Sequence, residues 1–296
     1  MEDLLIRLQQ VFEQEDIFKP ATTEKDLQDR IEYWIKKNGG VKNPDGSYSF
    51  KGDVKVPEFL VKNGRLMIKF KRVDGNFGCR MLGLKTLQGS PKYVGGSFYC
   101  SNNKLTTLEG APEYVGGNFD CRYNKLTSLE GAPKEIKGCF NCSNNQLTSL
   151  EGSPEYVGWD FDCSYNELTT LEGAPKYVGR DFICRDNQLT SLQGSPKYVG
   201  GNFDCAFNPI TSLQGSPKYV GGSFWCDHSK LTTLQGSPER VEGNFDCAYN
   251  KLTSLQGAPK YAGGNFICMG NPKEFTEEEV KKLCKVKGGV ITWRIF

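Results

Sequence analysis

The chain has 296 residues, and its 37 lysines and arginines nearly balance its 35 acidic residues, which leaves a formal charge of +2. This balance excludes a global field that would attract nucleic acid or an anionic membrane. The acidic N-terminal segment does not resemble a secretory signal, and no run approaches the roughly 20 apolar residues of a membrane-spanning helix. We therefore expect a cytoplasmic protein with reduced thiols, whose 12 cysteines need an explanation other than disulfides.

Residues 1–75 are predicted to form an N-terminal cap of helices and a β-hairpin. Apolar residues at helical spacing within residues 4–12 predict a first helix. Thr22 or Thr23 can cap a second helix, which should end at the Gly-Gly pair that follows it. The Asn-Gly pair at residues 63–64 lies between two apolar runs, which is a strong hairpin signal.

Cysteine recurs in the middle of the chain at a fixed interval of 21 residues, at Cys79, Cys100, Cys121, Cys142, Cys163, Cys184, Cys205, Cys226, Cys247 and Cys268. A fixed period of this length is the signature of a solenoid. Phe119, Cys121 and Asn124 fall on the fourth, sixth and ninth positions of the leucine-rich repeat pattern. Residues 76–271 are therefore predicted to form a leucine-rich repeat solenoid. We expect a curved parallel β-sheet of about ten rungs, few or no convex helices, and α+β caps.

Each unit is predicted to contain a short strand with Phe119 and Cys121 pointing inward and Asn118 and Asp120 pointing outward. A metal or redox series, catalytic thiols, and a buried structural column are the three alternatives for the cysteines. The structural column is favoured, because a zinc site needs thiols that converge on one point and these form a line. The asparagines of the ladder should pair buried backbone groups of the turns, at Asn103, Asn124, Asn145, Asn166, Asn187, Asn208 and Asn250.

Residues 272–296 are predicted to form a C-terminal cap of a helix and a strand. Thr276 and Glu279 have the spacing of a capping box that opens a short helix. Cys284 should pack this helix onto the last rung, and the apolar run after the glycines at 288–289 should form a closing strand.

The repeat LTTLEGAPEYVGGNFDC at residues 105–121 resembles the short leucine-rich repeats of bacterial proteins. With the N-P-D-G turn at 43–46 and G-D-V at 52–54, the chain is most similar to uncharacterised leucine-rich repeat proteins of large tailed bacteriophages. The similarity extends from about Ile31 to Met269. It implies a protein that meets host machinery inside a bacterium. Bacterial effectors with such repeats often append a ligase domain, for which the residues after Asn271 are too few.

The sequence offers no catalytic, metal or cofactor site, and we expect a protein that is not an enzyme. Phosphate-cradling and dinucleotide motifs are absent, and His228 is the only histidine. Asp227, His228 and Ser229 are consecutive, so their side chains should point in different directions and not assemble a triad. The aspartates that recur on alternate rungs could bind a cation, but a solvated face is favoured, at Asp120, Asp162, Asp204 and Asp246.

Function in a repeat array resides on positions that the fold leaves free. Trp159 and Arg180 replace a glycine that the other repeats carry, and aromatic and acidic side chains surround them. We name these residues the contact patch: Trp159, Asp160, Asp162, Tyr165, Arg180, Asp181, Ile183, Arg185, Asp186, Phe207, Trp225, Asp227 and His228. For the aromatic residues of this register, mutual packing along the sheet edge is the alternative, at Tyr123, Tyr165, Phe207 and Tyr249.

We predict that the contact patch binds a protein on the concave face. Aromatic and arginine side chains dominate protein-binding hot spots. The acidic face is unfavourable for nucleic acid. With the phage resemblance, the partner is expected to be a host bacterial protein, such as a defence protein that the chain inhibits or redirects. The alternative is an assembly protein that docks through its caps or as a homo-oligomer.

Overall fold

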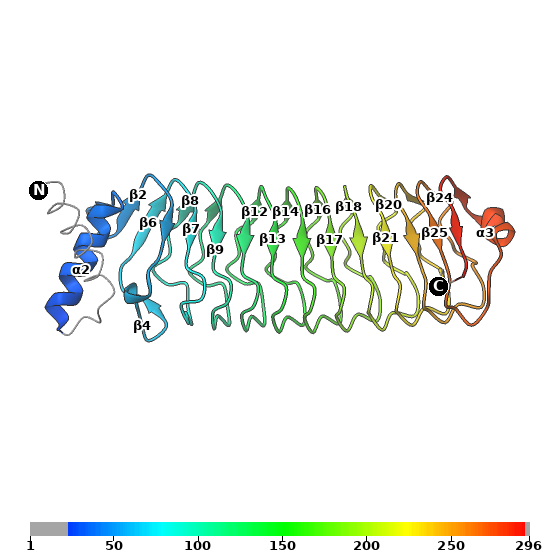
Figure 1. The fold of residues 1–296 in the computed structure, drawn as a ribbon, viewed down its shortest axis with the longest axis horizontal. Coiled ribbons are helices and arrows are strands. Elements are labelled where there is room, and N and C mark those ends of the chain that lie inside the picture. Colours follow the sequence, from blue (N-terminus) through cyan, green and yellow to red (C-terminus); the bar gives the residue numbers. More distant parts are fainter. Residues whose placement is uncertain (1–22, 294–296) are drawn as a thin grey trace, which may run out of the picture.

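The computed structural model describes residues 23–293, which form a parallel β-solenoid with turns stacked along the long axis of the molecule (Figure 1). Each turn contributes a short strand to each of two sheets. Register partners are equivalent residues of successive repeats, such as Phe119 with Phe140 and Val115 with Ile136. The predicted fold class is therefore confirmed, with about 12 turns in place of the expected ten.

The 13-stranded sheet, here called sheet A, consists in order of β1 (Val41–Lys42), β2 (Tyr48–Phe50), β6 (Phe70–Val73), β8 (Tyr93–Val94), β10 (Tyr114–Val115), β12 (Glu135–Ile136), β14 (Tyr156–Val157), β16 (Tyr177–Val178), β18 (Tyr198–Val199), β20 (Tyr219–Val220), β22 (Arg240–Val241), β24 (Tyr261–Ala262) and β26 (Lys285–Val286). The 12-stranded sheet B consists of β3 (Val54–Lys55), β7 (Phe77–Gly78), β9 (Phe98–Tyr99), β11 (Phe119–Asp120), β13 (Phe140–Asn141), β15 (Phe161–Asp162), β17 (Phe182–Ile183), β19 (Phe203–Asp204), β21 (Phe224–Trp225), β23 (Phe245–Asp246), β25 (Phe266–Ile267) and β27 (Val290–Ile291). Pairing is parallel throughout both sheets except between β1 and β2, which are antiparallel.

Sheet B is the sheet that the repeat pattern predicted, whereas sheet A was not anticipated. Its strands are two-residue Tyr-Val segments between a proline-containing turn and a Gly-Gly corner, too short to show the alternation by which strands are recognised. The valine nevertheless closes the core from the second side, because Val115 is 1% exposed.

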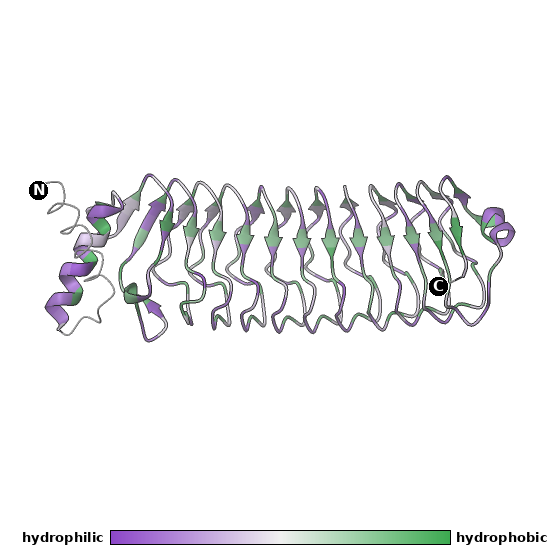
Figure 2. Cartoon of the chain, in the orientation of Figure 1, coloured by the Kyte–Doolittle hydropathy of each residue, from purple (hydrophilic) through white to green (hydrophobic). Residues whose placement is uncertain are grey.

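The core is a stack of identical layers between the two sheets, and its hydrophobic residues recur once per turn along the array (Figure 2). Phe119, Leu126 and Leu129 have no exposed surface, as predicted. The phenylalanine rings of neighbouring turns stack, with 5.2 Å between the centroids of Phe119 and Phe140. Because each layer is covered only by the next, the turns must associate in order to bury their apolar side chains.

The cysteines form a buried column, which confirms the structural interpretation. Every cysteine of the 21-residue series is at most 1% exposed. The thiol also has a polar role that the sequence did not reveal. Cys121 Sγ donates to the carbonyl oxygen of Asn141 on the next turn at 3.3 Å, and Cys226 Sγ donates to that of Asp246 at 3.1 Å. Cysteine therefore combines a small apolar volume with a weak donor.

The asparagine ladder pairs buried backbone groups, as predicted, and it also links consecutive turns, which was not predicted. Asn166 Nδ2 donates to the carbonyl oxygens of Cys142 at 3.2 Å and Cys163 at 3.0 Å. Its Oδ1 accepts from the backbone N–H of Leu147 at 3.1 Å. One amide thus pairs backbone groups of two turns that the fold buries.

The elements of the N-terminal segment follow the predictions for the described residues. Helix α2 (Glu24–Lys37) begins after Thr23, whose side chain accepts from a backbone N–H in a capping box. The hairpin joins β4 (Val61–Lys62) and β5 (Arg65–Leu66), with positive φ angles at Asn63 (56°) and Gly64 (80°). A 3-10 helix, η1 (Glu58–Leu60), precedes it. The helix predicted within residues 4–12 lies outside the described residues.

At the other end, helix α3 (Glu277–Leu283) opens with the predicted capping box of Thr276 and Glu279. Cys284 is buried at 1% exposure, and β27 pairs with β25 as the predicted closing strand. Strands before residue 76 and after residue 271 pair in parallel with the strands of the repeats. The division into three domains at these residues stays a prediction. Of the helices within residues 23–293, none combines the length and apolarity that crossing a bilayer requires.

Candidate protein-binding face

The contact patch lies along sheet B in three parallel columns of side chains. A corner column precedes the strands, at Trp159, Asp160, Arg180 and Asp181. A strand column follows it, where Asp162 pairs in register with Ile183 and both share a face with Trp225. A turn column comes last, at Tyr165, Arg185, Asp186, Phe207, Asp227 and His228. The register therefore brings the predicted residues together over four turns, which corresponds to about 15 Å.

The corner column is crowded, and this explains why glycine is the rule there. A Cβ atom at Gly138 would lie 2.2 Å from Oδ1 of Asn118 on the preceding turn, and one at Gly201 would lie 2.2 Å from Oδ1 of Asp181. Trp159 follows a turn in which Cys139 replaces this polar residue. The indole points away from the core and is 51% exposed.

Two acids of the corner column are bound to the neighbouring turn. Asp181 Oδ1 accepts from the backbone N–H of Asn202 at 2.8 Å. Asp160 Oδ1 accepts from the N–H of Asp181 at 3.2 Å and lies 3.8 Å from Nε of Arg180. Asn118 does the same for the N–H of Cys139 at 2.9 Å. Asp160 and Asp181 thus belong to a second polar ladder, and much of their hydrogen-bonding capacity is already used.

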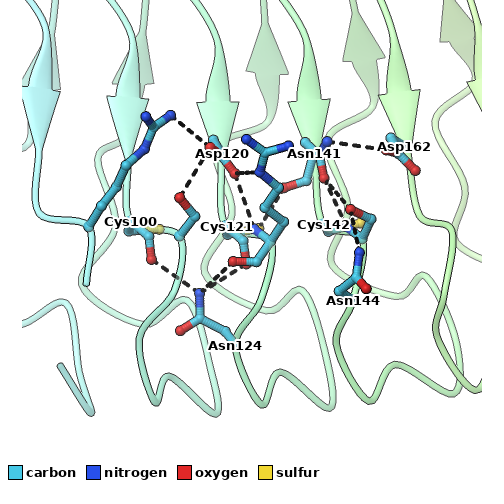
Figure 3. A network of polar contacts seen from close by, with 12 residues as sticks. Cys100, Asp120, Cys121, Asn124, Asn141, Cys142, Asn144 and Asp162 are labelled. Atoms are coloured by element: carbon cyan, nitrogen blue, oxygen red, sulfur yellow. Dashed lines mark hydrogen bonds and ion pairs between the residues drawn. The ribbon is translucent and has the colours of Figure 1, made fainter. Parts of the chain in front are cut away.

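The strand column is less solvated than the sequence led us to expect. Asp120, Asn141 and Asp162 follow one another in it on neighbouring strands (Figure 3). Asp120 and Asp204 are only 6% exposed, so the expected solvated face is wrong for these two residues. Asp120 is enclosed because Arg80, two turns earlier, reaches it at 2.8 Å and Nε of Arg122 lies 3.4 Å from its Oδ1. Side chains on a parallel sheet stand about 4.8 Å from those of the next strand, which shields a short carboxylate.

Burial changes the acidity of this column. Desolvation raises the pKa of Asp204 to about 6, although the N–H of Ala206 and the guanidinium of Arg185 oppose the rise. Desolvation likewise raises the pKa of Asp246 to about 6. Asp204 was expected on the exposed face but not assigned to the contact patch, and it lies in register between Ile183 and Trp225. In residues 23–293, no group of three or more His, Cys, Asp or Glu side chains is arranged to hold a metal ion.

The turn column has an unusual backbone. Four of its six residues adopt the left-handed conformation, with φ of 53° at Tyr165 and Asp186, 56° at Phe207 and 50° at His228. This conformation is uncommon for bulky residues and holds their side chains in a fixed outward direction. The asparagines at residues 102 and 144 occupy the same position, and asparagine tolerates this conformation best.

Part of the turn column packs against itself. The ring centroid of His228 lies 4.6 Å from that of Phe207 and 4.5 Å from that of Tyr249. The guanidinium of Arg185 lies 5.1 Å from the centroid of Phe207, and Asp227 Oδ2 lies 2.8 Å from Nδ1 of His228. The mutual-packing alternative is therefore correct for this segment, which includes Tyr249, a residue not assigned to the contact patch.

The two tyrosines nearer the N-terminus differ from this stack. Tyr123 and Tyr165 are each 52% exposed, with the smaller side chains of Asn144 and Asp186 on the turns that follow them. Together with Trp159 and Arg180, Tyr165 therefore presents much of the patch surface that the fold itself leaves uncovered.

Comparison with known proteins adds little to this description. No protein-family profile matches the chain, and no curated protein matches it. Among solved structures, the leucine-rich effector protein YopM of Yersinia pestis is similar, with a TM-score of 0.45 and 20% identity over 67% of this chain and 67% of that chain. YopM from Yersinia enterocolitica WA-314 has a TM-score of 0.41 and 15% identity over 82% of this chain and 65% of that chain. Likenesses this distant support no conclusion about function, and the fold rests on the strands described above.

Proposed function

We propose that this protein is a non-enzymatic scaffold that captures a protein partner on the outer face of sheet B. The observation that carries the proposal is the exposure of Trp159, which is 51%. The other repeats have glycine at this corner, apart from the repeat that has Arg180. The core does not use this apolar surface, and the same turn also exposes Tyr165, which gives the patch the composition of a binding hot spot.

The charges of the contact patch favour a partner with a basic surface. Asp162, Asp186 and Asp227 line the face beside the aromatic residues, and they remain only partly covered. Positive side chains on a partner complement these carboxylates and speed its docking. Nucleic acid is disfavoured by the same charges. Capture should therefore weaken as the salt concentration rises, because exposed charge pairs are screened.

The kind of partner and the effect of its capture are inferred from the resemblance of the repeat to phage proteins. The partner is then a cytoplasmic protein of the host bacterium, and capture inhibits or redirects it, for example as part of a defence system. A rigid array suits this task, because a partner meets preformed aromatic side chains whose positions the backbone of each turn already fixes.

Capture from host lysate tests the proposal when patch variants are compared with a matched control. Trp159→Ala and Tyr165→Ala should each reduce recovery of the partner at least tenfold, since hot-spot truncations remove about 2 kcal/mol or more. Tyr123→Ala is the control, because Tyr123 has the same exposure and the same left-handed backbone outside the patch. Trp225→Ala is a weaker probe because Trp225 is half-buried. Equal recovery with all variants would remove the patch as the binding surface.

A second candidate function is assembly through the C-terminal end. Trp293 is 67% exposed and Leu283 is 50% exposed there, beside the last strands of both sheets. A homo-oligomer formed at this end would bury them. Size-exclusion chromatography with light scattering separates the two candidates: a monomer favours capture of a foreign partner, whereas an oligomer that Trp293→Ala dissociates favours assembly.

A further inference from the structure

The outer face of sheet A carries a column of planar side chains that stack along the array. Tyrosine rings of neighbouring strands lie 4.8–4.9 Å apart, with planes 5–6° from parallel, in the pairs Tyr93–Tyr114, Tyr156–Tyr177 and Tyr177–Tyr198. Arginines continue the column, since the guanidinium of Arg72 lies 3.8 Å from the centroid of Tyr93 and that of Arg240 lies 4.0 Å from that of Tyr261. The stacking distance equals the strand spacing, so each strand supplies one planar group.

Glu135 interrupts this column. From β8 to β24 it is the only residue at this position that is neither tyrosine nor arginine. Glu135 pairs in register with Tyr156, and its strand β12 lies between β10 and β14 (Figure 1). Tyr114 and Tyr156 are therefore two strand spacings apart, about 9.6 Å. This separation accommodates one aromatic ring stacked between them. Tyr114 is covered by Tyr93 on one side and remains 38% exposed.

A cleft of about 510 Å³ opens beside this interruption. We call it the Glu135 cleft; its apolar walls are Tyr114 and the Ala-Pro turns at residues 111–112 and 132–133. These are the only neighbouring turns of the array that both have alanine there. Elsewhere serine often occupies this position, and the hydroxyl of Ser216 donates to the carbonyl oxygen of Gly236 on the next turn. Alanine leaves methyl groups in place of these hydroxyls, which makes this part of the surface apolar.

The charged rim of the cleft is balanced. Its ammonium groups come from Lys92, Lys134 and Lys137, and its carboxylates come from Glu109, Glu113 and Glu135. Lys92 and Glu113 form an ion pair at 3.0 Å. A balanced rim gives a phosphate group no net attraction, which disfavours a nucleotide as the occupant. It suits a neutral ring with a polar edge, whose hydroxyl can donate to a carboxylate.

We propose that the Glu135 cleft binds a tyrosine side chain presented by a partner protein, which extends the column by stacking on Tyr114. The ammonium group of Lys137, 6.0 Å from the centroid of the Tyr114 ring, moves aside as the ring enters. Its flexible side chain makes this displacement easy. The site lies on sheet A and does not rest on the function proposed for sheet B.

The test uses the full chain and N-acetyltyrosinamide as the probe, followed by NMR. Binding should shift the signals of Tyr114 and Ala132 saturably, and N-acetylleucinamide should bind about tenfold more weakly because it cannot stack. Glu135→Tyr should fill the cleft from within the chain and abolish binding, without lowering the melting temperature. Glu135→Gln should bind as well as the native protein, which separates filling of the cleft from loss of charge.

Three outcomes would overturn the proposal. Undiminished binding to the folded Glu135→Tyr variant would place the probe elsewhere. Equal affinity for the leucine probe would show that stacking is not the basis of recognition, and tighter binding of adenosine monophosphate would assign the cleft to nucleotides. Tyr219→Leu serves as the control, because Tyr219 occupies the same position on β20, away from the cleft, and is similarly exposed at 39%. Its affinity for the probe should be unchanged.

Discussion

Replacement of Asn166 by alanine tests whether the asparagine ladder stabilises the stack. The side chain is 8% exposed and bridges two turns. Its Nδ2 donates to the carbonyl oxygens of Cys142 at 3.2 Å and Cys163 at 3.0 Å. Its Oδ1 accepts from the N–H of Leu147. Alanine leaves these buried groups without this partner. An unsatisfied buried group costs about 1–3 kcal/mol. Because some carbonyl groups can find water at the edge of the turn, we expect a net loss of about 2–4 kcal/mol.

Amide hydrogen exchange is the most direct assay, because a solenoid need not unfold in one step. The N–H of Leu147 should exchange at least tenfold faster in Asn166→Ala, whereas amides several turns away should change little. Urea denaturation should show the corresponding fall in the free energy of unfolding. Gln188→Ala, at an exposed position of a neighbouring turn, is the control. An unchanged exchange rate at Leu147, with a stability loss below about 0.5 kcal/mol, would refute the reasoning.

Three further predictions concern the thiols, the buried acids and Ser229, which interrupts the asparagine ladder between Asn208 and Asn250. Native protein should react rapidly with a thiol reagent at Cys139 alone, because the other cysteines are buried. Cys139→Ala should remove this reaction, and rapid labelling of several thiols would contradict their burial between stacked turns. Asp204→Asn should be more stable than the native protein at pH 8 by about 1–3 kcal/mol but not at pH 4. The folded-state pKa of about 6 lies above the unfolded value, so the Asp204 carboxyl makes the native protein lose stability as pH rises from about 4 to about 6. Denaturation curves across this range should show a smaller loss in the variant, which keeps only the contribution of Asp246. Ser229→Asn should raise the free energy of unfolding by about 1–2 kcal/mol, because the new amide oxygen can accept from the N–H of Ile210. Asn208 accepts from the N–H of Leu189 in the same way. No gain in stability would mean that the backbone at residue 229 differs from that of the other turns.

Much of the fold was predictable because the repeat fixes the direction of each side chain. The interval between cysteines indicated a stack, and the pattern placed Phe119, Cys121 and Asn124 correctly. The capping threonines located the described helices because their hydrogen bonds are local. Sheet A escaped prediction since a single buried valine per turn, such as Val115, has no periodic neighbours by which a strand is recognised.

The candidate site was less predictable, because its residues act across turns. Asp160 and Asp181 have the composition of a recognition surface, yet each accepts from the backbone of the next turn. That role depends on the position of a backbone N–H in the next turn, which cannot be read from the residues around each aspartate. The stacking of His228 between Phe207 and Tyr249 likewise requires the left-handed backbone. At this position the asparagines at residues 102 and 144 and Asp186 carry a signal for that conformation, whereas the aromatic residues do not.

Since the strands of each turn pair only with those of the turn before it and the turn after it, whole copies can be gained or lost without changing the others. Gain or loss of one 21-residue repeat would lengthen or shorten the rod by about 4.8 Å. The reach of the molecule, and the separation between surfaces on its two sheets, can thus evolve independently of what either surface recognises.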